Sequence, residues 1–255
     1  MMYDAYIFDF YGTLCDIHTD EEKPDLWQKM SEVYCAYGAS YSGGDLKNAY
    51  HRALKCQIQE NLTLYEKGLI TKDERDNFEP DVTKAFGDLF LEKSVTPGRE
   101  LSKHIAVTFR ALSRDFITVF PGVKELLTDI RNAGKHVYLL SNAQTDFTRP
   151  EIEMLGLTQC FDDIFISSEQ KVKKPGEAFF RKLVEKYGLD VKRSVMTGND
   201  ETTDIQGALK CGMDCLLIQT ATSPKYTGRY KPTYLIPDGD FTKVRGMIFD
   251  AQILL

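Results

Sequence analysis

The chain has 255 residues, of which 42% are hydrophobic and 27% are charged, a balance typical of globular proteins. This composition excludes a wholly disordered or collagen-like chain, and no apolar run approaches the roughly 20 residues that a membrane span needs. The formal net charge of −6 argues against nucleic acid or an anionic membrane as the main partner.

The six cysteines include no CxxC pair. In a chain of this length we interpret them as buried thiols of a reducing compartment, and not as a disulfide framework or a zinc site. The first residues show no basic segment followed by an apolar stretch, so we expect a cytoplasmic protein. The sequence predicts no oligomeric state.

The first predicted element is a buried strand over residues 3–9, which ends at Asp9 and opens into a Gly-Thr turn. From about residue 19 to residue 114, apolar residues recur at helical spacing, so we expect an all-helical block. Its helical segments are residues 24–37, 45–61, 72–90 and 100–113.

After residue 120 the pattern changes to strands that alternate with helices. The predicted helices are residues 123–132, 176–187 and 204–210, and the strands are residues 136–140, 164–166, 194–197, 215–219 and 233–236. Such alternation favours an α/β fold, a Rossmann-like parallel sheet with helices on both faces. The helical block interrupts this series. We therefore predict a core domain of residues 1–17 and 116–255 and an inserted helical domain of residues 18–115.

Polar side chains follow several of the predicted strands, where an open α/β sheet binds its ligands. Asp9 and Thr13 follow the first strand, and Lys174 precedes a helix. Later strands end at Ser141, Asn142, Asn199 and Asp200, with Asp204 four residues further on. Each residue has a structural alternative as a turn residue, a helix cap or a solvated lysine. Their joint placement favours a single site.

This placement resembles the haloacid dehalogenase superfamily of aspartate-nucleophile hydrolases. The matching motifs are Asp9-Phe-Tyr-Gly-Thr-Leu, Leu139-Leu-Ser-Asn, Lys174-Pro and Gly198-Asn-Asp-Glu-Thr-Thr-Asp. The resemblance covers residues 3–20 and 118 to about 220, and the helical block lies where that superfamily inserts its first type of cap domain.

The resemblance implies a role for each matching residue. Asp9 would attack the substrate and form a covalent ester that water then hydrolyses. Ser141 would hydrogen-bond the substrate's anionic group, and Thr13 would orient Asp9. Lys174 would hold the charge of the nucleophile and of the substrate.

The resemblance also implies Mg²⁺, bound by Asp9, Asp200 and the backbone carbonyl of Tyr11, because a hard cation prefers oxygen ligands. Supporting metal candidates are Asn199 and Asp204, and the groups expected to contact a small anionic substrate are Tyr11, Gly12 and Asn142.

Tyr11 departs from the phosphatases of the superfamily, which carry an aspartate there as general acid and base. A phenol is a poor proton shuttle at neutral pH. Tyrosine at this position, continued by residues 14–19, is similar to the 2-haloacid dehalogenases, whose halide leaving group needs no proton. Those enzymes also use a cap arginine, for which Arg52 is a candidate.

The fourth motif favours the opposite assignment, because it offers Asp200, Glu201 and Asp204, which we expect to lie close to Asp9. Carboxylates packed together repel one another unless a cation lies among them. The favoured hypothesis is therefore a Mg²⁺-dependent phosphohydrolase for a small phosphorylated metabolite. The alternatives are a metal-independent 2-haloacid dehalogenase and a non-catalytic phosphate-binding or regulatory protein.

Overall fold

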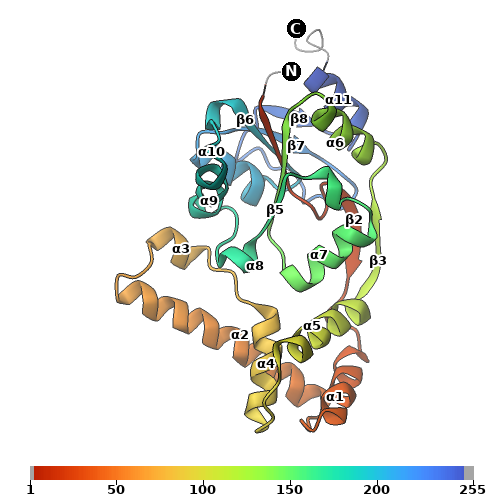
Figure 1. The fold of residues 1–255 in the computed structure, drawn as a ribbon, viewed down its shortest axis with the longest axis vertical. Coiled ribbons are helices and arrows are strands. Elements are labelled where there is room, and N and C mark those ends of the chain that lie inside the picture. Colours follow the sequence, from red (N-terminus) through yellow and green to blue (C-terminus); the bar gives the residue numbers. More distant parts are fainter. Residues whose placement is uncertain (1–2, 250–255) are drawn as a thin grey trace.

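The structure, a computed structural model that describes residues 3–249, contains a sheet of six strands, which lies in the upper half of the view in Figure 1. The sheet order is β5 (Asp163–Ile166), β4 (His136–Ser141), β1 (Ala5–Phe8), β6 (Ser194–Gly198), β7 (Asp214–Ile218) and β8 (Tyr234–Ile236). All neighbours pair in parallel, and Ile7 of β1 lies opposite Tyr138 on one side and Met196 on the other. The predicted Rossmann-like α/β fold is confirmed.

Both faces of the sheet are buried, which explains why its strands are nearly continuous apolar runs. Phe8 of β1 packs into a cluster with α6 (Val123–Asn132), α7 (Thr145–Met154) and α11 (Phe241–Phe249). Its neighbour Ile7 points to the other face. The helices of that second cluster are α9 (Glu177–Tyr187) and α10 (Gln206–Lys210), and the short α8 (Ser167–Gln170) follows β5.

The residues between β2 and β3 form five helices with an aromatic core of their own, which includes Trp27, Tyr50 and Phe109. These helices are α1 (Leu26–Ala36), α2 (Gly43–Glu66), α3 (Lys72–Asp76), α4 (Val82–Glu92) and α5 (Arg99–Ser113). One residue of the sheet region, Phe147 of α7, joins this core. The inserted helical block is therefore present, and it packs on the sheet region through α7.

The prediction of one helix over residues 72–90 was wrong, because the chain leaves the helix between α3 and α4. Pro80 lies in this gap, and the backbone before a proline avoids the helical conformation. Asp81 then starts α4 as its N-cap, accepting a hydrogen bond from the Lys84 backbone N–H.

Two strands that the sequence did not predict join the helical block to the sheet region. β2 (Cys15–Thr19) and β3 (Arg114–Val119) pair antiparallel, with Ile17 opposite Ile117. The proposed domain boundaries, 17/18 and 115/116, fall inside this ribbon. The division into two domains at these positions stays a prediction.

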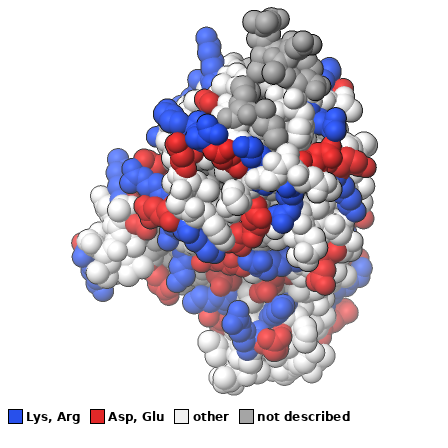
Figure 2. All heavy atoms as spheres, turned by 45° about the horizontal axis from the view of Figure 1, so that its top comes forward, with Lys and Arg blue, Asp and Glu red and all other residues white. Residues whose placement is uncertain are grey.

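All six cysteines are free thiols, as expected, but not all are buried. Cys35 and Cys56 lie exposed on helices of the insertion, which corrects the expectation of buried thiols. Within residues 3–249 no helix combines the length and the apolar character needed to cross a bilayer. On the face shown in Figure 2, acidic and basic side chains are interspersed.

Candidate active site

A pocket of about 370 Å³ opens at the carboxyl ends of β1, β4 and β6. Of the predicted site residues it brings together Asp9, Tyr11, Gly12, Ser141, Asn142, Lys174, Asn199, Asp200 and Asp204. The remaining one, Thr13, is fully buried and contacts Asp9. The convergence expected from the strand ends therefore occurs, because β4 and β6 flank β1 in the sheet.

Asp9 lies directly after β1 and is held on both carboxylate oxygens. Its Oδ1 accepts hydrogen bonds from Lys174 Nζ at 2.7 Å and from Ser141 Oγ at 3.2 Å. Its Oδ2 lies 3.3 Å from Thr13 Oγ1. The residue is only 8% exposed, so these contacts fix the orientation of its side chain. Oδ2 has fewer donors and is the freer of the two oxygens.

Lys174 is buried, and its ammonium group is bonded in three directions. Besides Asp9 it contacts the Leu140 carbonyl at 2.7 Å and Asp204 Oδ1 at 2.7 Å. Burial would lower the pKa of Lys174, but the charges of Asp204 and Asp9 outweigh it and raise the pKa. The lysine is therefore charged and offsets part of the negative charge of the carboxylates around it.

Asp204 shares Lys174 with Asp9. Burial is the main reason that the pKa of its carboxyl is raised to about 7, while Lys174 acts in the opposite direction. Its Oδ2 accepts the backbone N–H of Asp200 at 3.1 Å. Residue 198 must be glycine for this packing, because a Cβ there would lie 2.2 Å from Asp204 Cγ.

The oxygen donors of the pocket suit a hard cation. Asp9 and Asp200 line it together with Asn199, and Asp204 adds a third carboxylate against the single ammonium of Lys174. Asp200 Oδ1 accepts from the backbone and hydroxyl of Thr202, at 2.7 and 2.8 Å. Among residues 3–249, no three His, Cys, Asp or Glu side chains already stand at ligand distance around one point. A cation here would rely on backbone or water oxygens as well.

Tyr11 lines the pocket, but its phenol is directed at α7. Its hydroxyl donates to Glu151 Oε2 at 2.5 Å and lies 2.9 Å from Thr148 Oγ1. Burial and the charge of Glu151 raise the pKa of the Tyr11 phenol well above its usual value. The phenol is therefore a fixed hydrogen-bond donor and a poor proton shuttle.

Glu151 in turn ties α7 to the helical insertion, and nothing in the sequence motifs indicated it. Its Oε1 lies 2.7 Å from Arg110 Nε of α5 and 2.6 Å from Arg114 Nη1 of β3. Burial would raise the pKa of this carboxyl, but the arginine and tyrosine contacts lower it. These residues stand on three separate elements, so only the fold shows their contact.

Two residues of the matching motifs are engaged in holding the backbone. Asn142 bonds the backbone of Lys174 with both ends of its amide, at 2.8 and 2.9 Å. Glu201, although next to Asp200, accepts from Thr227 Oγ1 and from the backbone N–H groups of residues 227–229. Contact of Asn142 with a substrate stays a prediction.

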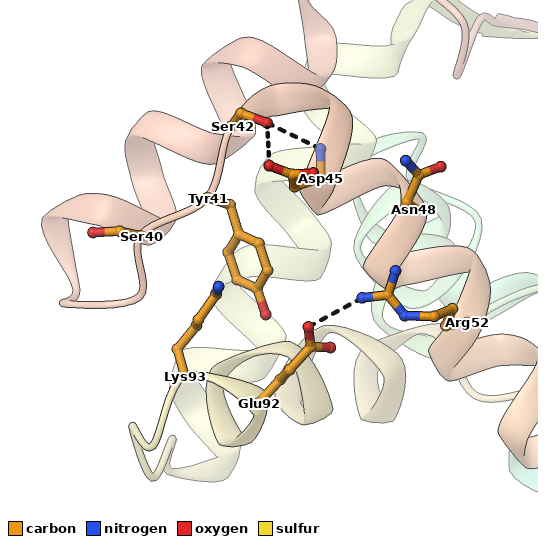
Figure 3. Close-up of a pocket in the computed structure, with 8 residues that line it drawn as sticks. All are labelled: Ser40, Tyr41, Ser42, Asp45, Asn48, Arg52, Glu92 and Lys93. Atoms are coloured by element: carbon orange, nitrogen blue, oxygen red, sulfur yellow. Dashed lines mark hydrogen bonds and ion pairs between the residues drawn. The ribbon is translucent and has the colours of Figure 1, made fainter.

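A second pocket, of about 500 Å³, lies wholly within the helical insertion (Figure 3). Arg52 lines it and forms an ion pair with Glu92 at 3.0 Å, while Lys93 lies over the Tyr41 ring. Arg52 is thus not among the residues that line the Asp9 pocket.

Comparison with known proteins gives a match to the model of the haloacid dehalogenase-like hydrolase family over residues 3–212. The chain is 28% identical over 114 residues to the glyceraldehyde 3-phosphate phosphatase of Methanothermobacter thermautotrophicus, covering 45% of this chain and 50% of the relative. It is 27% identical over 145 residues to the N-acylneuraminate-9-phosphatase of Rattus norvegicus, covering 56% and 58%. The matched regions thus span about half the length of these relatives.

Among solved structures, a 2-haloacid dehalogenase of Pseudomonas syringae pv. Tomato aligns with a TM-score of 0.62. The alignment covers 97% of this chain and 99% of the other, at 16% identity. At this identity the likeness shows a shared fold.

Proposed function

Because the chain belongs to the haloacid dehalogenase-like hydrolase family, we propose that it is a Mg²⁺-dependent phosphohydrolase of a small phosphorylated molecule. The two phosphatases reported above support the reaction class. The observation that carries the proposal is the environment of Asp9, a buried carboxylate that shares one lysine with Asp204 at the mouth of a polar pocket.

In this proposal Asp9 Oδ2 attacks phosphorus, an O–P bond forms, and the bond to the leaving oxygen breaks. Lys174 places its positive charge against Asp9, and Ser141 and Thr13 hold the orientation of the carboxylate. Water then hydrolyses the acyl phosphate and releases inorganic phosphate. Since the Tyr11 phenol is bonded to Glu151, the leaving oxygen takes its proton from water.

Mg²⁺ would be held by Asp9, Asp200 and the backbone carbonyl of Tyr11, with Asn199 and Asp204 close by. When bound, it would supply positive charge that offsets the crowded carboxylates and the phosphate. The free thiols are consistent with a cytoplasmic location, which we include in the proposal.

The experiment measures phosphate release from a panel of phosphate esters with Mg²⁺ and with a chelator. We expect Mg²⁺-dependent release that Asp9→Asn abolishes. The matched control is Asp88→Asn. Asp88 lies on α4, forms an ion pair with Lys84 and is not among the residues that line the Asp9 pocket. Absence of release from every ester in the panel, with the protein folded, would contradict the proposal.

Tyr11 keeps dehalogenation as a second candidate, because a halide leaves without the proton that this site does not supply. Chloride release from 2-chloropropionate in the presence of a chelator distinguishes the two reactions. Phosphate binding without turnover of either substrate would instead indicate the non-catalytic alternative.

A further inference from the structure

The loop that carries Lys174, residues 171–178, is held from two sides. On the side of the sheet, Asn142 bonds both backbone groups of Lys174. On the other side lies a segment of the helical insertion, residues 71–83, which we call the arm. The arm contains α3 and the chain that leads to α4, and α3 lies against α9 (Figure 1).

The arm pairs with this loop through its backbone. Phe78 and Val172 form an antiparallel bridge, and the Lys173 N–H donates to the Asn77 carbonyl at 2.8 Å. This bond lies one residue before Lys174. A neighbouring bond, from the Glu79 N–H to the Lys171 carbonyl, is longer, at 3.4 Å.

The arm also caps the helix that follows Lys174. α9 begins after Gly176, which has no side chain to cap the first turn. Asp73 of α3 caps this turn instead, because its Oδ2 accepts a hydrogen bond from the Ala178 N–H at 2.8 Å. A carboxylate at this end of a helix satisfies a free N–H and is favoured by the helix dipole. Residue 176 must also be small, because a Cβ would lie 2.8 Å from Asn77 Cβ.

The far end of the arm is attached as well. Ser167 Oγ donates to Glu79 Oε2 at 3.0 Å. The side-chain amide of Gln144 donates to the Pro80 carbonyl and accepts from the Val82 N–H. The arm is thus an attachment of the insertion to the sheet region in addition to the β2–β3 ribbon. One of the places where it meets that region is the loop that holds Lys174.

We propose that the arm is a positioning element of the active site, which stays attached to residues 171–178 during turnover and keeps Lys174 against Asp9. The inference rests on the role of Lys174 in the proposed function. The arm acts on Lys174 through the backbone on both sides of it, at the Lys173 N–H and at the Ala178 N–H.

The first experiment compares Asp73→Ala with Asp76→Ala on the same helix. The Asp76 side chain is exposed and pairs with Arg75. We expect Asp73→Ala to speed amide exchange in residues 171–178 and to lower kcat about tenfold with little change in KM. Asp73→Asn, which keeps an acceptor oxygen, should keep both amide exchange in residues 171–178 and kcat close to their wild-type values. Asp73→Ala behaving as Asp76→Ala does in exchange and in kcat would overturn the proposal.

The second experiment locks the arm in place with a disulfide between Phe78→Cys and Val172→Cys, since residues opposite each other in an antiparallel pair meet the distance requirement. Oxidised wild type controls for the native thiols. We expect the locked enzyme to keep its turnover. A loss of more than tenfold that reductant reverses would show that the arm must detach, and would refute the proposal.

The exchange measurement needs no substrate, so it separates this inference from the proposed function. Slow exchange in residues 171–178 that depends on Asp73 supports the attachment even if no phosphate ester is hydrolysed. If Asp73→Ala does not change amide exchange in residues 171–178 and the protein is an active phosphatase, the role of the arm is refuted and the proposed function stands.

Discussion

At the scale of single residues, Tyr11 decides how the chemistry must proceed. It stands two residues after Asp9, yet its phenol donates to Glu151 and its pKa is raised by burial and by that carboxylate. Tyr11 therefore lines the pocket and connects this part of its wall to α7 through Glu151. A reaction here depends on how readily the leaving group departs without a proton.

We accordingly predict that the rate of phosphate release falls steeply as the pKa of the leaving alcohol rises. Tyr11→Phe should leave this slope unaltered and cost less than tenfold in kcat, far below the ~10²–10⁴-fold typical of a lost general acid. It should lower the free energy of unfolding by about 1 kcal/mol, because Glu151 loses a donor. Kinetics on a series of aryl phosphates and denaturant unfolding measure these effects. A slope that is steeper in the variant than in the wild type would assign the proton to Tyr11.

Glu79 of the arm gives a pH prediction. Burial is the main cause that raises the pKa of its carboxyl above the usual 4.5. The folded chain thus holds this proton more tightly than the unfolded chain, so the stability it contributes is present below pH 4.5 and is lost as the pH rises above it.

Glu79→Gln cannot ionise and still accepts from Ser167. We expect it to be more stable than wild type at pH 8 by about 0.5 kcal/mol or more, with the advantage gone at pH 4. Urea unfolding at both pH values tests this. Glu66→Gln, at an exposed position of α2, is the control. A variant that is less stable than wild type at pH 8 would mean that the ionised carboxylate is favourable there.

The sequence predicted the residues that converge on Asp9, because the ends of neighbouring parallel strands share one edge of a sheet. It did not predict the contacts that hold them. Glu151, Arg110 and Asp73 lie in helices with ordinary surface patterns, and their partners are distant in the chain. Periodicity assigns a residue to a face of its helix, but only the packing of helices identifies what that face meets.

At the scale of elements, Glu151 joins α7 to α5 and β3 through Arg110 and Arg114. The carboxylate is 3% exposed, so its loss would leave two arginines without their buried counter-charge. We predict that Glu151→Ala lowers the free energy of unfolding by about 3–5 kcal/mol.

The comparison for this prediction is Glu153→Ala, which removes an exposed carboxylate from the same helix and should change stability by less than about 0.5 kcal/mol. Chemical denaturation of both variants provides the measurement. If both variants change the free energy of unfolding by equally small amounts, solvent compensates the charges of the two arginines. The Glu151 contacts would then contribute little to stability.

The accuracy of the predicted elements follows the strength of their local signals. The helix at residues 123–132 begins and ends as predicted, because Gly122 and Gly134 flank a clear amphipathic run. Residues 72–90 keep a helical pattern across Pro80, so periodicity alone joined two helices. The β2–β3 ribbon was missed because it is short and partly exposed, and it forms only when segments about 100 residues apart meet.

At the scale of the whole molecule, the insertion and the sheet region are joined by several independent contacts. Phe147 of α7 packs into the aromatic core of the insertion, Glu151 binds Arg110 of α5, and the arm pairs with residues 171–178. Contacts this extensive favour unfolding as one cooperative unit, even though the hydrophobic clusters are separate.

The chain's one tryptophan makes this testable, because Trp27 is buried in the core of the insertion and reports on that part alone. We predict that the unfolding transition followed by Trp27 fluorescence coincides with the one followed by far-ultraviolet circular dichroism, which reports on all helices. Phe147→Ala should weaken the coupling and move the fluorescence transition to lower denaturant, whereas Phe116→Ala, at an exposed position of β3, should not. Transitions that are already separate in the wild type would show that the insertion unfolds on its own. In that case the arm, which is part of the insertion, would lose its contacts with residues 171–178 whenever the insertion unfolds. It could then not hold Lys174 in place.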